Sequence, residues 1–108
     1  MRITFDLDNM KDEVVMGKAF LLKVAFPNSI VRYRRSSSGE GGHIEIFDVD
    51  ISEEAMYDIR YLFGDHYRRI CIDASRGTGD KPMLPKQVLF DFKIVKGEIK
   101  RAGIWRYL

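Results

Sequence analysis

Two short motifs in the first half of the chain carry residue types that can do chemistry. Asp6 and Asp8 flank a leucine at the end of an alternating segment, and this spacing places both carboxylates on one side of a strand. Residues 36–47 hold a serine run, a glycine-rich turn and then His43 at the start of an apolar strand. Small residues before a strand allow a ligand to approach backbone N–H groups closely. The turn therefore predicts a phosphate or nucleotide site, with a merely flexible loop as the alternative.

A third aspartate, Asp73, ends a short segment in which apolar and polar residues alternate, residues 69–73. If this segment is a strand beside the first one, Asp6, Asp8 and Asp73 share one sheet face. Three carboxylates there raise each other's pKa unless a cation lies between them. Paired divalent cations about 3.5–4 Å apart serve phosphoryl and nucleotidyl transfer, and Mg²⁺ and Mn²⁺ prefer oxygen ligands. We therefore expect a Mg²⁺ or Mn²⁺ site, with ordinary solvated carboxylates as the alternative.

Hydrophobic periodicity predicts the elements that position these residues. In chain order they are a strand over 3–8, a helix from Asn9 or Asp12 to Ala25, a strand over Ile30–Arg35, a strand over 43–49, a helix from Asp50 or Ser52 to Gly64, and a strand over 69–73. A mobile loop over 75–86 and a strand over 88–94 with inward Val88, Phe90, Phe92 and Ile94 come next, followed by a turn at 96–98 and a last segment over 99–107.

The order β-α-β-β-α-β is typical of the α+β ferredoxin-like, or RRM-like, arrangement. It predicts an antiparallel sheet with two helices on one face and a C-terminal β-hairpin extension. The first and third strands lie together in the middle, and the fourth flanks the first. The uncovered face of the sheet is then the natural binding surface, as in RNA-recognition modules.

Composition limits the class of protein. A chain of 108 residues is a single domain, 1–108, and 45% apolar residues are enough for a core. A net charge of only +2 excludes binding to nucleic acid by bulk charge alone. The lone Cys71 and the absence of a signal-peptide pattern favour a cytoplasmic protein. No apolar run reaches the ~18–20 residues of a membrane span, and the scarcity of amide side chains leans towards a thermophilic source.

The motifs resemble those of a known family. Asp6-Leu7-Asp8 resembles the hDhD motif of the archaeo-eukaryotic primase superfamily, and residues 38–43, reading SGEGGH, resemble its S-G-x-G-x-H motif. Residues 69–73 resemble its third motif, a hydrophobic strand that ends in aspartate. The three occur in the family's order and cover residues 3–73. The polymerase domain of bacterial end-joining ligases carries similar motifs.

The resemblance implies an RRM-like nucleotidyltransferase core for nucleic-acid replication or repair, with nucleoside triphosphate and nucleic acid as partners and no membrane. It implies that Asp6, Asp8 and Asp73 are catalytic metal ligands. The nucleotide-binding residues that it implies are Ser38, Gly39, Gly41 and His43. Family members usually have a second unit that grips template and nucleotide, for which 108 residues leave no room. We therefore expect a minimal core, either active or retaining only its binding functions.

Basic residues suggest a second surface. The candidates for nucleic-acid contact are Arg32, Arg34, Arg35, Arg69 and Arg76. Neighbouring tyrosines can stack on bases, so these arginines and tyrosines could form a basic surface for nucleic acid, while ion pairing with the 16 acidic residues is the ordinary alternative. Two further functions remain open, a non-catalytic RRM-like nucleic-acid-binding protein and a small dimeric structural or regulatory protein.

Overall fold

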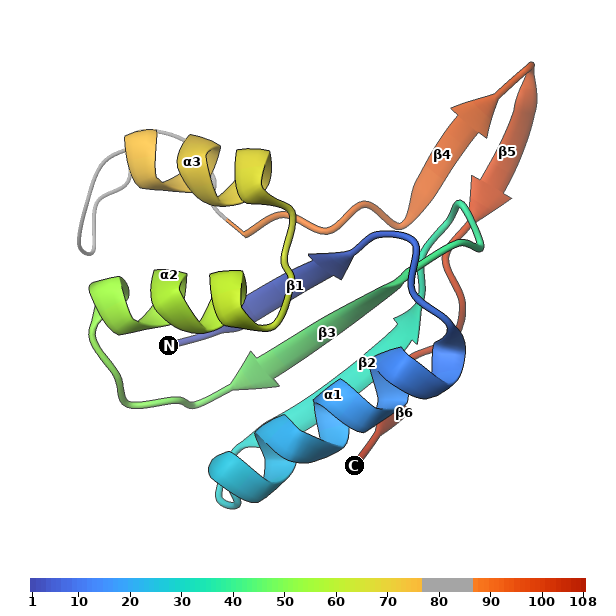
Figure 1. The fold of residues 1–108 in the computed structure, drawn as a ribbon. Helices are drawn as coiled ribbons and strands as arrows, with labels where there is room; N and C mark the ends of the chain where they lie inside the picture. The colour runs from blue at the N-terminus through green and yellow to red at the C-terminus, as the bar shows by residue number, and fades with distance from the viewer. Residues whose placement is uncertain (77–86) are drawn as a thin grey trace.

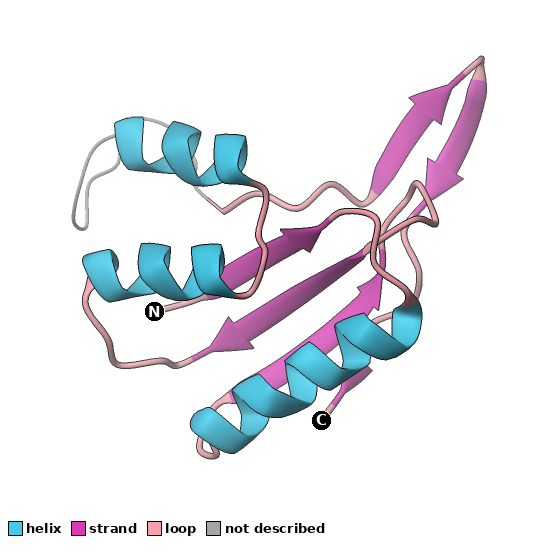
Figure 2. Cartoon of the chain, in the orientation of Figure 1, coloured by secondary structure: helices cyan, strands magenta, loops and turns pink. Residues whose placement is uncertain are grey.

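A computed structural model describes residues 1–76 and 87–108, so most of the loop predicted over 75–86 lies outside the described residues. The described chain is an α+β fold with a four-stranded antiparallel sheet, a separate two-stranded sheet and three helices (Figures 1 and 2). Its elements are β1 (Ile3–Leu7), α1 (Asp12–Ala25), β2 (Ile30–Arg35), β3 (Gly42–Phe47), α2 (Glu53–Leu62), α3 (Tyr67–Ser75), β4 (Phe92–Val95), β5 (Glu98–Arg101) and β6 (Arg106–Tyr107).

The main sheet has the strand order β1-β3-β2-β6, so the predicted neighbours β1 and β3 do pair, but β1 is an edge strand of this sheet and not a central one as predicted. Helices α1 and α2 lie on the same face of this sheet (Figure 1). Alternation explains the core, because Ile3, Phe5 and Leu7 of β1 are completely buried and point towards the helices. The core is completed by Val15, Ala19 and Leu22 of α1, Val31 and Tyr33 of β2, Ile44 and Ile46 of β3, and Val49 and Met56.

The two predicted helices begin differently from each other. The hydroxyl of Ser52 accepts a hydrogen bond from the Ala55 N–H at 3.1 Å, so the predicted cap of α2 is confirmed. The residue that precedes α1 is Lys11, which makes no side-chain cap, so neither Asn9 nor Asp12 has the predicted capping role. The extent of α1 is nevertheless as expected, because its buried stripe drives it against the sheet.

The predicted fourth strand is wrong, since residues 69–73 belong to helix α3. Ile70 and Asp73 are its buried residues, and their spacing of three fits one face of a helix. Five alternating residues are too few to distinguish a strand from a helix. The order of elements therefore departs from β-α-β-β-α-β at the sixth position.

Side chains take the place of the missing strand along the outer edge of β1. The Thr4 N–H donates to the Gln87 side-chain oxygen at 2.7 Å, and the Asp6 N–H donates to Asp65 Oδ1 at 2.8 Å. Arg69 of α3 donates to the Thr4 carbonyl at 3.2 Å. These bonds satisfy backbone groups that an unpaired edge would otherwise leave exposed.

The second face of the sheet, which is opposite α1 and α2, is not the uncovered surface that the sequence predicts. Arg34 and His43 on this face are only 5% and 4% exposed, and Thr4 and Glu45 are also buried. The guanidinium of Arg34 lies 4.2 Å from the centre of the Trp105 ring. The C-terminal segment, whose role the sequence left open, thus packs on the second face, and β6 extends the sheet beyond β2.

The strand predicted over 88–94 is shorter and is placed differently. Only β4 is strand, and it pairs with β5 in the expected C-terminal hairpin, with the turn at Lys96 and Gly97. Phe90, Phe92 and Ile94, which were expected to point inward, are all exposed. In the described ranges, no helix is long and apolar enough to cross a membrane.

Candidate functional site

A pocket at one end of the sheet gathers residues from the first two motifs. Its volume is about 310 Å³, and we call it the first pocket. It is lined by Asp6, Asp8, Ser36, Ser37, Ser38, His43, Phe90, Phe92 and Lys93. The site residues Asp6, Asp8, Ser38 and His43, which the sequence predicted, are therefore brought to one place. Phe90, Phe92 and Lys93 were not predicted as site residues, because only the path of the chain after α3 takes them there.

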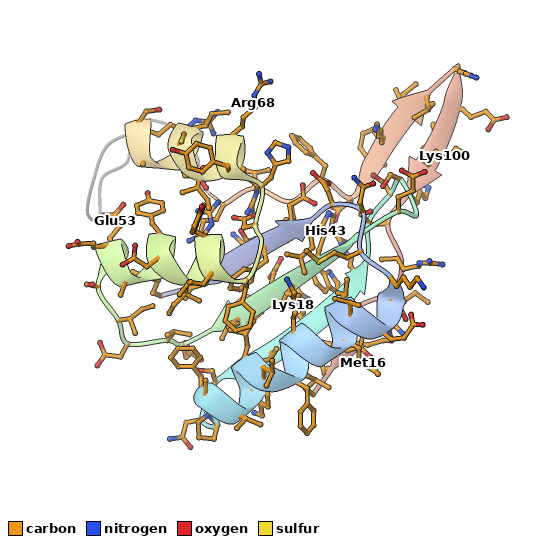
Figure 3. The ribbon with its side chains drawn as sticks, viewed as in Figure 1. Met16, Lys18, His43, Glu53, Arg68 and Lys100 are labelled. Carbon is orange, nitrogen blue, oxygen red and sulfur yellow. The ribbon has the colours of Figure 1, made fainter. Side chains whose placement is uncertain are left out.

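Sheet register explains how His43 is held. Asp6 and Arg34 are its partners on the neighbouring strands β1 and β2, so the three side chains form a row across the second face. Arg34 Nε donates to His43 Nδ1 at 3.0 Å. The imidazole proton must then lie on Nε2 when His43 is neutral, and Nε2 is 3.5 Å from Asp6 Oδ1. The row thus sets the tautomer of neutral His43 and turns its N–H towards Asp6. Figure 3 labels His43 on the sheet.

The electrostatic environment keeps Asp6 ionised. Burial raises the pKa of Asp6, but the hydrogen bond from His43 and the positive charges of His43, Arg69 and His66 outweigh it. The net result is a pKa below the ordinary 3.8. Asp8 lies 3.5 Å from His66 in a pair that is about half exposed. The first pocket therefore holds an anionic Asp6 beside the more accessible carboxyl group of Asp8.

The glycines of the second motif shape the turn, and their predicted contact with a nucleotide stays a prediction. A Cβ atom on Gly41 would lie 1.9 Å from the carbonyl oxygen of Leu7. Gly41 thus lets the turn pack directly against the end of β1, which brings Ser38 into the same pocket as Asp8. Gly39 has a φ of +75° in the turn, and neither it nor Gly41 is among the residues that line the first pocket. Their contribution is to the shape of the turn.

Asp73 does not line the first pocket with Asp6 and Asp8, although it lines a neighbouring pocket that also includes Asp6. It lies on α3, its side chain is 5% exposed, and its Oδ2 is 2.8 Å from Arg60 Nη1. The same oxygen accepts a hydrogen bond from the Gln87 N–H at 3.1 Å. In the part of the chain that the structure describes, no group of three or more His, Cys, Asp or Glu residues is placed to hold a metal ion.

A network of paired charges that the sequence did not predict joins α2, the loop after it and α3. We call it the corner network, and its members are Arg60, Asp65, Arg69 and Asp73. Asp65 Oδ2 is 2.6 Å from the Nε of Arg60, which is fully buried, and 2.9 Å from Arg69 Nη1. The charges balance, as burial of ionised groups requires. Asp65, Arg69 and Asp73 are spaced four residues apart, which is the spacing of neighbouring side chains on one face of a helix. The sequence therefore contained a sign of a helix here, but residues 69–73 were predicted to be a strand.

The five predicted nucleic-acid arginines do not form one surface. Arg34 is buried in the row with His43, and Arg69 belongs to the corner network. Arg32 lies between Glu45, at 3.0 Å, and the Trp105 ring, whose centre is 4.0 Å from its guanidinium carbon. Arg35 is exposed, and Arg76 lies at the end of α3. Three of these side chains, Arg32, Arg34 and Arg69, therefore serve internal contacts, and the role of all five in binding nucleic acid stays a prediction.

A second pocket, of about 480 Å³, adjoins the first and was not predicted. It is lined by Asp6, His66, Arg68, Arg69, Ile72, Asp73, Arg76, Val88 and Phe90. The two pockets share Asp6 and Phe90. Ile72, Val88 and Phe90 give the second pocket an apolar part, and arginines give it a basic part. A ligand held by its charged end in the first pocket can therefore extend over Phe90 towards apolar side chains.

Comparison of the chain with known proteins finds no matching family model, no matching curated protein and no matching solved structure.

Proposed function

We propose that this protein binds a nucleoside triphosphate together with a divalent cation in the first pocket, as a reduced, primase-like domain. One observation carries the proposal. Asp6, Asp8, Ser38 and His43 come from two motifs about 30 residues apart, and they line a single pocket. The run β1-α1-β2-β3-α2 also matches the first five elements of an RRM-like unit, which supports the resemblance on which the proposal draws.

The residues present suit Mg²⁺ or Mn²⁺ that arrives with the nucleotide. Mg²⁺ is commonly held by one or two protein carboxylates, substrate phosphates and water, without a full cage of protein ligands. Asp6 and Asp8 supply two carboxylates, and the lowered pKa of Asp6 keeps it anionic at neutral pH. The cation would neutralise phosphate charge, which two carboxylates alone would repel.

The rest of the first pocket suits a phosphate chain and a base. The hydroxyls of Ser36, Ser37 and Ser38 and the ammonium of Lys93 are donors that can bind phosphate oxygens. The exposed ring of Phe90, between the two pockets, offers a surface on which a base can stack. A nucleotide could thus place its phosphates in the first pocket and its base towards the second.

We do not propose that the protein adds nucleotides to a nucleic-acid strand. Nucleotidyl transfer commonly uses two metal ions, and Asp73 was the expected third carboxylate ligand for them. The pairing of Asp73 with Arg60 already neutralises its charge. The pairing of Asp73 with Arg60 therefore favours a domain that binds a nucleotide without adding it to a nucleic-acid strand.

Thermal unfolding with Mn²⁺ and a nucleoside triphosphate tests the proposal. Ligand present at about 100 times its Kd stabilises the native state by about 2.7 kcal/mol. We expect the midpoint to rise only when both ligands are present, and the rise to be lost in Asp8→Asn and reduced in Ser38→Ala. Asp50→Asn is the matched control, because Asp50 belongs to the chain's other Asp-x-Asp sequence and is exposed away from the pocket residues.

Two outcomes would overturn the proposal. One is the absence of a shift with both ligands in the millimolar range. The other is a shift of equal size in the wild type, Asp8→Asn and Asp50→Asn, which would place the ligand elsewhere. Asp8 is preferred to Asp6 and Asp73 because the latter two make internal contacts that support the fold.

A further inference from the structure

The hairpin formed by β4 and β5 projects from the body of the protein and belongs to its own two-stranded sheet (Figures 1 and 2). A two-stranded hairpin is marginally stable alone, so its side chains would be expected to gain support by packing on the body. They do not, since Phe92, Ile94 and Ile99 are 53%, 65% and 59% exposed. The hairpin therefore presents most of its side-chain surface outward.

The register of the hairpin sorts these side chains onto two faces. Phe92 pairs with Arg101 and Ile94 pairs with Ile99, so these four residues share one face. Lys93 and Lys100 are directly opposite each other on the other face. Like charges in directly opposed positions destabilise a strand pair. Glu98 on this face lies 3.9 Å from Lys100, and an anionic partner along the lysines would relieve the repulsion that remains.

Positive charge is concentrated on this hairpin. Residues 92–101 contain four basic residues, which are Lys93, Lys96, Lys100 and Arg101, and one acidic residue, Glu98. Their excess of three positive charges exceeds the +2 of the whole chain. Figure 3 shows Lys100 on this hairpin. The hairpin therefore carries a local excess of positive charge, whereas Arg34 and Arg69 serve internal contacts.

We infer that the β4–β5 hairpin is an arm that binds single-stranded nucleic acid. Lysines that follow a phosphate backbone, combined with exposed aromatic rings on which bases stack, are the recurring means of binding single strands. Phe90 and Phe92 supply such rings at the base of the arm. Phe92 and Lys93 also line the first pocket, so a strand on the arm leads towards it.

The placement of the side chains favours nucleic acid over a membrane surface. A hairpin that inserts into lipid needs apolar side chains at its tip, but this turn is formed by Lys96 and Gly97. The apolar residues lie along one face instead, where bases can stack beside the basic face. The inference does not depend on the proposed nucleotide site, because the arm projects from the sheet and Lys96 and Lys100 do not line the first pocket.

Fluorescence anisotropy of a labelled 20-nucleotide oligothymidylate, measured with the full chain at several salt concentrations, tests the arm. We expect salt-sensitive binding by the wild type. Lys96→Asn/Lys100→Gln should weaken it on the order of 10-fold and lower the slope of log K against log salt by about 1.4, because two phosphate contacts are lost. Asparagine is chosen at position 96 because it tolerates the positive φ found there, 52°.

The control variant Lys11→Gln/Lys23→Gln removes the same charge at the two ends of α1, outside both pockets, and should leave affinity within about twofold. Phe92→Leu, which keeps an apolar side chain without an aromatic face, should weaken binding by about fivefold or more. If the hairpin and control variants lost affinity equally, the net charge of the protein would explain the binding, and the inference would be overturned.

Binding to phosphatidylserine vesicles without binding to the oligonucleotide would also overturn it, as would the absence of binding to either. The thermal shift with Mn²⁺ and nucleoside triphosphate should persist in Lys96→Asn/Lys100→Gln. The nucleotide proposal and the arm can therefore fail separately.

Discussion

Asp8 and Asp73 show how differently two aspartates of one chain can be used. Both belong to motifs for which the sequence predicted metal binding, and both lie near β1. Asp8 lines an open pocket and has a partly exposed histidine as its neighbour. Asp73 is buried against Arg60 and also accepts the N–H of Gln87. The first carboxylate can still bind an incoming cation, whereas the second is already neutralised by the fold.

Because of this difference, we expect Asp73 to matter for the stability of the fold and Asp8 to matter for ligand binding. A charge in the corner network is held among buried opposite charges, so removing one member leaves another uncompensated. The charge of Asp8 in the first pocket faces solvent, so removing it should destabilise the fold little but weaken ligand binding strongly. The predictions below test whether the two regions are separated in this way.

The largest loss of stability is expected from a substitution in the corner network. Asp73→Asn leaves the fully buried Arg60 with a single carboxylate, and we expect a loss of about 3–5 kcal/mol in the free energy of unfolding. Urea denaturation measures this loss, and Asp58→Asn at an exposed position of α2 is the matched control. An Asp73→Asn protein that is fully stable yet binds no Mn²⁺ and nucleotide would return Asp73 to the predicted metal site.

Gly41→Ala is the next largest change and acts on the first pocket through packing. The new methyl group would collide with the Leu7 carbonyl, so the turn must move away from β1 at a cost of about 1–3 kcal/mol. Ser38 moves with the turn, and the thermal shift with nucleotide should fall. Gly17→Ala is the control, because a Cβ there meets nothing within 4 Å and alanine favours the helix by up to about 1 kcal/mol. Equal stability of the two variants would contradict the close packing at Gly41.

Acid should weaken the row of Asp6, His43 and Arg34. The folded-state pKa of Asp6 lies below the ordinary 3.8, so its stabilising contribution is complete above that value and is lost as the pH falls below it. Urea unfolding between about pH 2.5 and 6 should show a steeper loss in the wild type than in Asp6→Asn, which has no carboxyl group to titrate. If the stability of the two proteins fell in parallel with pH, the neighbours of Asp6 would not stabilise its ionised form, contrary to the prediction.

The smallest effect on stability is expected at Asp8. Its pair with His66 is about half exposed, and such pairs contribute about 0–1 kcal/mol. Asp8→Asn should therefore unfold within about 1 kcal/mol of the wild type, as judged by urea denaturation, while the nucleotide-dependent shift is lost. A loss comparable to that of Asp73→Asn would remove the distinction between the two regions.

Several features could be predicted because they depend on residues close together in the chain. Alternation in β1, β2 and β3 and the buried stripe of α1 indicate which side chains face the core, and Ser52 marks the start of α2. The Asp-Leu-Asp spacing and the serine and glycine turn were sufficient to nominate Asp6, Asp8, Ser38 and His43. Pairing of β1 with β3 then brought these residues together, as the expected topology required.

The remaining features were decided by contacts between distant segments. Residues 69–73 fit a strand or a helix by their own pattern, and the partners Arg60 and Asp65 favour the helix. The alternating residues of 88–94 were expected inside the fold, yet β4 pairs only with β5 and its apolar side chains stay exposed. Local patterns report how a segment can fold, but burial of a charge or exposure of an apolar face depends on the partners that tertiary structure supplies.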